Sequence, residues 1–332
     1  MSQSELLSPT DVLAAGETIS MLKAGLNQVL LDQGGVTERV VTAVLARGHV
    51  LLEGLPGLGK TELCKGLARL LSLPFKRIQF TPDLLPGDIT GTYVIEGEKR
   101  DFSFRPGPLF ASVVLADEIN RSSPKTQSAL LEAMAERNVT VLGHTHPLPD
   151  PFFVLATQNP IELEGTYPLP EAQLDRFLFR VVVPGVSAKT MSAMLTQRVR
   201  GQPPPQKPVL DGAALKTVFD FVDRVHLPVP VADFIGRLVE ATHPNHASAP
   251  ESVRRFVRYG ASPRAALGFA SSARAWALGK GKPNVGFDEV KEVAGAVLNH
   301  RLVLSYEAGL EKVGSDKVVT DLLAAVQEVP RG

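Results

Sequence analysis

The sequence has almost no cysteine, no excess of either charge and no long apolar run. Among its 332 residues, Cys64 is the single cysteine, which excludes an internal disulfide and a thiolate metal cluster. Lys and Arg number 35, as do Asp and Glu, and this balance disfavours a dedicated nucleic-acid-binding protein, whose affinity depends on surplus basic residues. No apolar run approaches the ~18 residues of a membrane span, and the first residues lack the basic stretch of a signal peptide. We therefore expect a cytoplasmic protein with no membrane span.

The length and composition indicate a folded chain with two domains. Hydrophobic residues make up 44% of the chain, which is more than a disordered protein contains. Its 332 residues are about twice the ~150 of an average domain. The neutral total conceals a division, because residues 1–185 hold 16 basic and 21 acidic side chains, whereas residues 186–332 hold 19 and 14. Turn-forming residues at Pro184-Gly185 and a proline cluster at 203–208 place the domain boundary there.

The first domain has the pattern of a parallel α/β sheet. Short apolar runs bounded by turn residues alternate with helical patterns, as in sheets whose strands are buried on both faces. The expected strands cover residues 49–53, 75–80, 112–116, 152–157 and 178–183, with helices at 36–47 and 61–71. Two further stretches, around 92–104 and 138–147, alternate apolar and polar residues and predict β-hairpins inserted into this core.

The second domain is predicted to be all-α. Its periodicity is mostly helical, with candidate helices at 211–225, 231–242, 263–279, 287–305 and 316–328.

A phosphate-binding loop follows the first expected strand. The stretch from Gly54 to Thr61 matches G-x-x-x-x-G-K-[ST] and lies between a strand and a helix, as that motif requires. Glycines allow backbone N–H groups to surround phosphates, and the helix N-terminus adds its dipole. Lys60 supplies a charge for the β- and γ-phosphates, and the Thr61 hydroxyl is a ligand for Mg²⁺. The residues expected to bind nucleotide are Gly54, Leu55, Pro56, Gly57, Leu58, Gly59, Lys60, Thr61 and Glu62.

Polar residues at the ends of two other strands complete a predicted hydrolytic site. Asp117 follows an apolar run and would hold Mg²⁺, and Glu118 would then face the γ-phosphate as the general base for a water. The extra carboxylate favours an enzyme that hydrolyses with water over a small-molecule kinase, which must exclude water. Asn159 ends the strand at 152–157 and is expected to orient the attacking water.

These motifs, taken in order, resemble those of the MoxR family of AAA+ ATPases. The resemblance covers roughly residues 28–305 and is carried by segments 48–61, 117–134 and 162–179, by Leu174-Asp-Arg176-Phe177, and by Ser262-Pro-Arg264. It implies a P-loop core with a helical lid that assembles into a ring of six subunits, with ATP and Mg²⁺ bound between neighbours. The hairpins correspond to insertions of that clade. One departure is at residues 30–35, which lack the Ile/Val-Gly-Gln sequence that often lines the adenine pocket.

The resemblance also implies roles for two arginines. Arg176 would be the arginine finger that reaches a neighbour's γ-phosphate, although Arg121 is a rival for that role, and an ion pair of Arg176 with Asp175 or Glu171 is the structural alternative. Arg264 would be the sensor arginine of the lid. A cation in the first turn of a helix opposes the helix dipole, which favours a functional role for it.

The implied task is chaperone-like remodelling or activation of client protein complexes, with a von Willebrand factor A domain protein as partner. A magnesium-chelatase-type motor subunit, a DNA-acting AAA+ protein and a nucleotide-gated scaffold are the alternatives.

Overall fold

The computed structural model describes residues 6–96, 101–159, 165–198 and 202–329. Its strands are β1 (Val50–Glu53), β2 (Phe75–Gln79), β3 (Gly91–Glu96), β4 (Asp101–Pro106), β5 (Val113–Asp117), β6 (Asn138–Val141), β7 (His144–Pro147), β8 (Phe153–Gln158), β9 (Phe179–Val182), β10 (Val257–Tyr259) and β11 (Val303–Leu304). Its α-helices are α1 (Pro9–Val29), α2 (Gly34–Leu45), α3 (Lys60–Leu70), α4 (Pro86–Thr90), α5 (Pro124–Glu136), α6 (Glu171–Leu174), α7 (Ala188–Gln197), α8 (Gly212–Arg224), α9 (Val229–Glu240), α10 (Glu251–Phe256), α11 (Pro263–Gly279), α12 (Phe287–Leu298), α13 (Tyr306–Leu310) and α14 (Ser315–Ala325). A short 3₁₀ helix, η1 (Ile119–Arg121), follows β5.

Five parallel strands form the central sheet, in the order β2-β5-β8-β1-β9. Successive side chains of a strand point to opposite faces, and both faces of the inner strands β5, β8 and β1 are buried. Leu51, Val114 and Val154 pack on one face with α4, α5 and the hairpins, and the next residue along each strand packs on the other face with α1, α2 and α3. The five strands predicted from the sequence are confirmed. The expected burial on both faces holds for the inner strands, whereas the edge strand β2 exposes Lys76 and Arg77.

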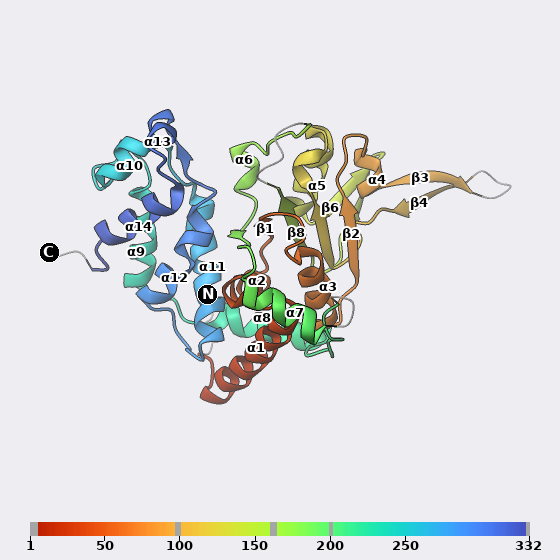
Figure 1. Ribbon diagram of the computed structural model, residues 1–332, viewed down its shortest axis with the longest axis horizontal. Helices are drawn as coiled ribbons and strands as arrows, with labels where there is room; N and C mark the ends of the chain where they lie inside the picture. The colour runs from red at the N-terminus through yellow and green to blue at the C-terminus, as the bar shows by residue number, and fades with distance from the viewer. Residues whose placement is uncertain (1–5, 97–100, 160–164, 199–201, 330–332) are drawn as a thin grey trace.

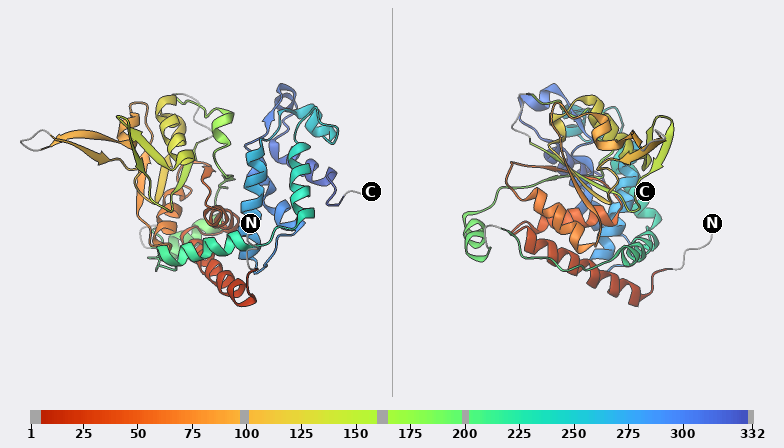
Figure 2. Two further views of the ribbon diagram at one scale, coloured as in Figure 1. Left: turned by 180° about the vertical axis from the view of Figure 1, so that it is seen from behind. Right: turned by 90° about the vertical axis from the view of Figure 1, so that its right-hand side faces the viewer.

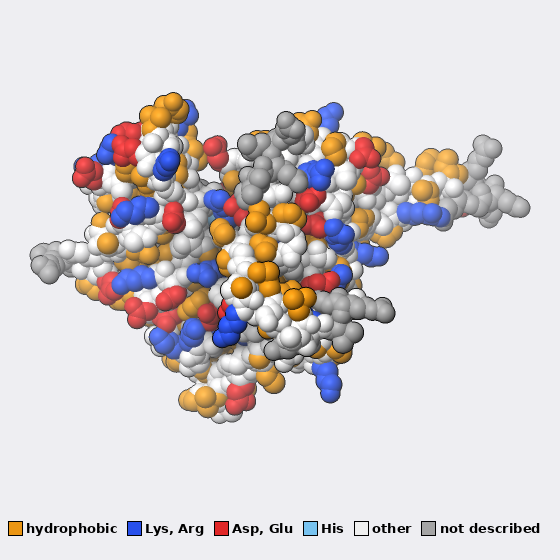
Figure 3. Space-filling view, viewed as in Figure 1, with side chains coloured by type: hydrophobic (Ala, Val, Ile, Leu, Met, Phe, Trp, Pro, Cys, Tyr) orange, Lys and Arg blue, Asp and Glu red, His pale blue; other side chains and the backbone are white. Residues whose placement is uncertain are grey.

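Both predicted hairpins are present on the core. The β3–β4 hairpin projects from the body of the protein, and hydrophobic side chains lie near its outer end (Figures 1 and 3); Ile95 and Phe102 there are 59% and 68% exposed. The β6–β7 hairpin packs against its base, where His146 stacks on Phe104 with ring centroids 3.8 Å apart. Residues 97–100 of the predicted first turn lie outside the described residues.

The lid is helical, as predicted, and stands beside the core (Figures 1 and 2). It differs from the prediction at residues 287–305, where α12 ends at Leu298. The chain then turns, because His300 and Arg301 hydrogen-bond to core carbonyls and Val303–Leu304 pairs with β10. The lid therefore contains a two-stranded ribbon, β10–β11, in addition to its helices.

The predicted boundary at residue 185 remains a prediction. The helix α8, which follows that boundary, packs against α1, α2 and α11 and so links the two parts. No helix within the described parts of the chain is both long and apolar enough to cross a membrane.

Candidate active site

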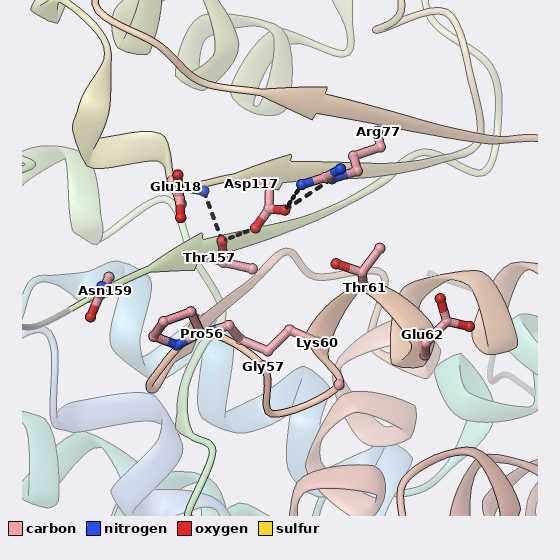
Figure 4. Close-up of a pocket in the computed structure, with 11 residues that line it drawn as sticks. Pro56, Gly57, Lys60, Thr61, Glu62, Arg77, Asp117, Glu118, Thr157 and Asn159 are labelled. Carbon is pink, nitrogen blue, oxygen red and sulfur yellow. Dashed lines mark hydrogen bonds and ion pairs between the residues drawn. The ribbon is translucent and has the colours of Figure 1, made fainter. Parts of the chain in front are cut away.

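The carboxyl ends of β1, β5 and β8 meet at one edge of the sheet and carry the predicted polar residues. In parallel sheets, ligands bind outside this edge, where the strand order reverses. Here β1 lies between β8 and β9, and the phosphate-binding loop leaves its end. A cavity of about 350 Å³ opens there. Figure 4 shows its lining: Pro56, Gly57, Gly59, Lys60, Thr61, Glu62, Arg77, Asp117, Glu118, Thr157 and Asn159.

The loop adopts a conformation suited to phosphate. Gly57 and Gly59 both have φ of +82°, which side-chain-bearing residues rarely adopt, and a Cβ on Gly59 would lie 2.9 Å from Leu30. The Nζ atom of Lys60 donates to the carbonyl oxygens of Gly54 and Leu55. Burial lowers the pKa of Lys60, and the charges of Asp117 and Glu118 oppose that change. The Lys60 ammonium group is thus held within the loop, where phosphate oxygens can replace the two carbonyl oxygens as its hydrogen-bond acceptors.

The structure brings together most of the predicted nucleotide-binding residues, with two exceptions among their side chains. The Leu58 side chain packs against the hydrophobic core, and the Leu55 side chain is 44% exposed outside the cavity lining. Gly54 also lies outside the lining, and a Cβ there would be 2.7 Å from the Val183 carbonyl oxygen. Glu62 reaches the edge of the cavity and pairs with Lys65 at 2.8 Å.

Asp117 is fixed by residues of both neighbouring strands. Arg77 on β2 donates from Nε and Nη2 to Oδ2 of Asp117, at 2.9 and 2.7 Å. Thr157 on β8 donates to Oδ1 at 2.6 Å. Figure 4 shows this row of contacts facing the loop that carries Lys60 and Thr61.

Glu118 has a strained backbone and two side-chain partners. Its φ of 56° and ψ of 51° lie in the left-handed region, which residues other than glycine adopt less readily. Its Oε2 atom accepts from Gln79 at 2.8 Å and from Arg121 at 3.1 Å. The backbone N–H of Glu118 also donates to Thr157 Oγ1. This conformation turns the carboxylate into the cavity beside Asn159, which is 7% exposed.

The donors in this cavity fit nucleotide and a hard cation. Thr61 offers a hydroxyl and Asp117 a carboxylate, and magnesium prefers such oxygen ligands. Gly57 has no atom within 4 Å of the position of a Cβ, which leaves room against the backbone for phosphate.

Three residues of the site were not identified from the sequence. Arg77, Gln79 and Thr157 belong to no motif, and only the pairing of β2 and β8 with β5 places them beside the carboxylates. Gln33 was part of the segment that departs from the usual adenine-pocket sequence. It is buried, donates to the Pro184 carbonyl oxygen at 3.2 Å, and its Oε1 atom has no hydrogen-bond partner among the described residues.

The predicted arginine finger and the predicted sensor arginine both line a second cavity. This cavity has a volume of about 460 Å³ and lies between the core and the lid. Arg176 and Arg264 both line it, and none of its lining residues lines the cavity of the phosphate-binding loop. The side chain of Arg176 donates to the Leu131 carbonyl oxygen of α5. Arg121, the alternative finger, lies beside Glu118 of its own subunit.

Comparison with known proteins agrees with this geometry. Residues 49–179 match the model of the ATPase family associated with various cellular activities (AAA), and residues 251–322 match the AAA lid domain. The chain is 42% identical to "Chaperone MoxR1" of Mycobacterium tuberculosis over 301 residues, which are 91% of this chain and 80% of that protein. It is 33% identical to "Protein MoxR" of Paracoccus denitrificans over 308 residues, covering 85% of this chain and 88% of that protein.

A solved structure shares the fold of both parts. It is the crystal structure of a protein assigned as an ATPase from Cytophaga hutchinsonii, with a TM-score of 0.88 and 36% identity over 97% of this chain and 98% of that one. The two family matches cover the phosphate-binding loop with the Asp117–Glu118 pair and most of the helical lid of this chain. This protein is a nucleotide-binding ATPase and belongs to the MoxR family of AAA+ proteins.

Proposed function

We propose that the protein hydrolyses ATP at sites shared between neighbouring subunits of a ring, and that it uses this cycle to remodel client protein complexes. Within one subunit, the loop residues 54–62 bind the phosphates, with Lys60 as their cation. Glu118 acts as general base for a water that Asn159 orients. Thr61 and Asp117 hold Mg²⁺, which neutralises phosphate charge when it is bound.

The separation of the two cavities carries the proposal of a shared site. Arg176 and Arg264 line a different cavity from Lys60, so each subunit presents a phosphate-binding half and an arginine half. Head-to-tail contact between copies would bring the two halves together, and such a contact gives a ring when the rotation from one copy to the next closes. An arginine delivered by a neighbour stabilises the charge of the transition state. We expect six subunits, as the family resemblance implies.

Mixed rings test the shared site. Arg176→Ala subunits keep an intact phosphate-binding half, and Lys60→Ala subunits keep an intact arginine half. Each variant alone should keep only a small residual rate, and mixing them should restore ATP hydrolysis at the hybrid interfaces. A second mixture, in which Arg121→Ala replaces Arg176→Ala, decides between the two candidate fingers. Restored activity is expected only for the arginine that acts on a neighbour's nucleotide. If confirmed mixed rings show no restored activity, Arg176 does not act on a neighbour's nucleotide.

The client and partner proposals rest on similarity to MoxR proteins, one of which is named a chaperone. We propose a cytoplasmic protein that works with a von Willebrand factor A domain protein and a client complex. Capture from lysate on a Glu118→Gln variant held in ATP should retain that partner. Activation of hydrolysis by DNA, lost steeply with salt, would instead support the DNA-acting alternative.

A further inference from the structure

Three lid side chains converge on Asp175, the residue directly before Arg176. Ser262 Oγ donates to Oδ2 of Asp175 at 2.8 Å, and Arg301 Nε donates to Oδ1 at 2.8 Å. Arg264 lies 3.8 Å from the same carboxylate. Ser262 caps the N-terminus of α11, and Arg301 follows the end of α12, so two lid helices are tied to one side chain of the core.

The lid also holds the backbone on both sides of Arg176. Arg301 donates to the carbonyl oxygens of Asp175, Phe177 and Leu178, at 3.3, 2.7 and 3.0 Å. His300 Nε2 lies 2.9 Å from the Phe177 carbonyl oxygen. Burial, followed by the charge of Arg301, lowers the pKa of His300 well below its ordinary value, so the ring is neutral and Nε2 is its donor.

Asp175 pairs with Arg301. The sequence had left an ion pair between Asp175 and Arg176 as an alternative. The Arg301 side chain is 3% exposed and that of Asp175 is 16% exposed. A guanidinium buried to this degree requires a charged partner. Arg176 is thereby left to contact the core, through the Leu131 carbonyl oxygen, and the second cavity.

We propose that Asp175 is a positioning residue, through which the lid of a subunit sets the place of Arg176. A change of lid position moves Ser262 and Arg301, and their shared carboxylate carries that movement to the next residue in the chain. The position of the lid in one subunit thus affects the hydrolysis rate at its neighbour's site. This inference rests on the proposed role of Arg176 as a finger.

Asp175→Asn tests the proposal with little change of shape. The amide oxygen can still accept from Arg301, but the charge that holds Arg301 and Ser262 is lost. We expect kcat to fall roughly 10- to 100-fold, the effect of about 1 Å of displacement of a reacting group. The KM for ATP should stay close to that of the parent protein, because the phosphate-binding half is intact. Glu289→Gln is the matched control, since it removes a buried lid carboxylate whose partners are Lys282 and the Gly286 N–H.

Two readouts separate positioning from a purely structural ion pair. Asp175→Asn added to Arg176→Ala should cause no further loss of kcat, and mixing Asp175→Asn with Lys60→Ala subunits should restore activity. Additive losses, or no restoration in confirmed mixed rings, would overturn the positioning role. If Arg176→Ala alone leaves kcat unchanged, the proposed finger fails first, and the positioning role fails with it.

Discussion

Arg77 of β2 donates two hydrogen bonds to one oxygen of Asp117. The Arg77 guanidinium is therefore paired with the same Asp117 carboxylate that we propose as a ligand of Mg²⁺. Both groups line the same cavity, and the pair is partly exposed, since the Asp117 side chain is 13% exposed and that of Arg77 is 47% exposed. Mg²⁺ and Arg77 therefore compete for one carboxylate, and binding of the metal favours release of Arg77.

Replacing Arg77 should make magnesium easier to bind. In Arg77→Gln, we expect the half-saturating concentration of Mg²⁺ for nucleotide binding to fall roughly fivefold, the equivalent of about 1 kcal/mol for a partly exposed ion pair. A Mg²⁺ titration with a fluorescent ATP analogue measures this. Lys76→Gln is the control, because it removes the same charge from the adjacent exposed position of β2. An unchanged or higher Mg²⁺ requirement in Arg77→Gln contradicts the competition.

Glu118→Gln should separate binding from hydrolysis. Loss of a general base costs about 10²–10⁴-fold in turnover, whereas the residues that contact phosphate are unaltered. We expect unchanged binding of an ATP analogue and a turnover reduced by that factor. Glu132→Gln, at an exposed position of α5, should keep full activity. If Glu118→Gln hydrolyses ATP at the parental rate, another group is the base.

Acid should destabilise the fold through His49. Its Nδ1 accepts from the Val154 N–H at 3.0 Å, and its Nε2 lies 3.2 Å from the Met134 carbonyl oxygen. Burial, with the charge of Arg137, lowers its pKa to about 3. Below about pH 6.5 the imidazole of His49 becomes protonated in the unfolded chain but stays neutral in the folded protein. The free energy of unfolding contributed by His49 is thus complete above that pH and decreases as the pH falls, by about 2 kcal/mol at pH 5.

Urea unfolding at pH 7 and pH 5 measures this loss, and His49→Gln removes the titrating group. The variant should be less stable at pH 7, yet lose about 2 kcal/mol less than the parent protein between the two pH values. Equal losses in both proteins would mean that other groups carry the pH dependence.

The contact between the β3–β4 and β6–β7 hairpins can be tested with a pair of stability variants. Phe104 stacks on His146 and contacts Tyr93 and Phe110, whereas Phe102 on the same face is 68% exposed. Phe104→Ala should lower the free energy of unfolding by about 1–3 kcal/mol, from lost burial and ring contacts. Phe102→Ala should change it by less than about 0.5 kcal/mol. Equal effects, measured by urea unfolding, would show that the stacking does not stabilise the junction.

The sequence predicted the parts of the site that lie within one contiguous motif. The loop before Thr61 and the pair Asp117–Glu118 could be recognised because each follows a buried strand directly. Arg301 could not, since it meets Asp175 across 126 positions of the chain and only the packing of the lid brings them together. The same contact explains why the helix expected to reach residue 305 ends at Leu298. Helical periodicity carries no information on a side chain whose partners belong to another domain.

The helix α5 connects features that are far apart in the fold. It begins shortly after η1, which follows Glu118, it accepts the Arg176 hydrogen bond at Leu131, and it ends where β6 begins. With 13 residues it is roughly 20 Å long. Because one helix joins these three places, the segment after Glu118, the Arg176 contact and the β6–β7 hairpin are held at fixed spacings from one another. Inserting or removing one turn of helix within α5 would therefore change both the distance and the direction from the Arg176 contact to the β6–β7 hairpin.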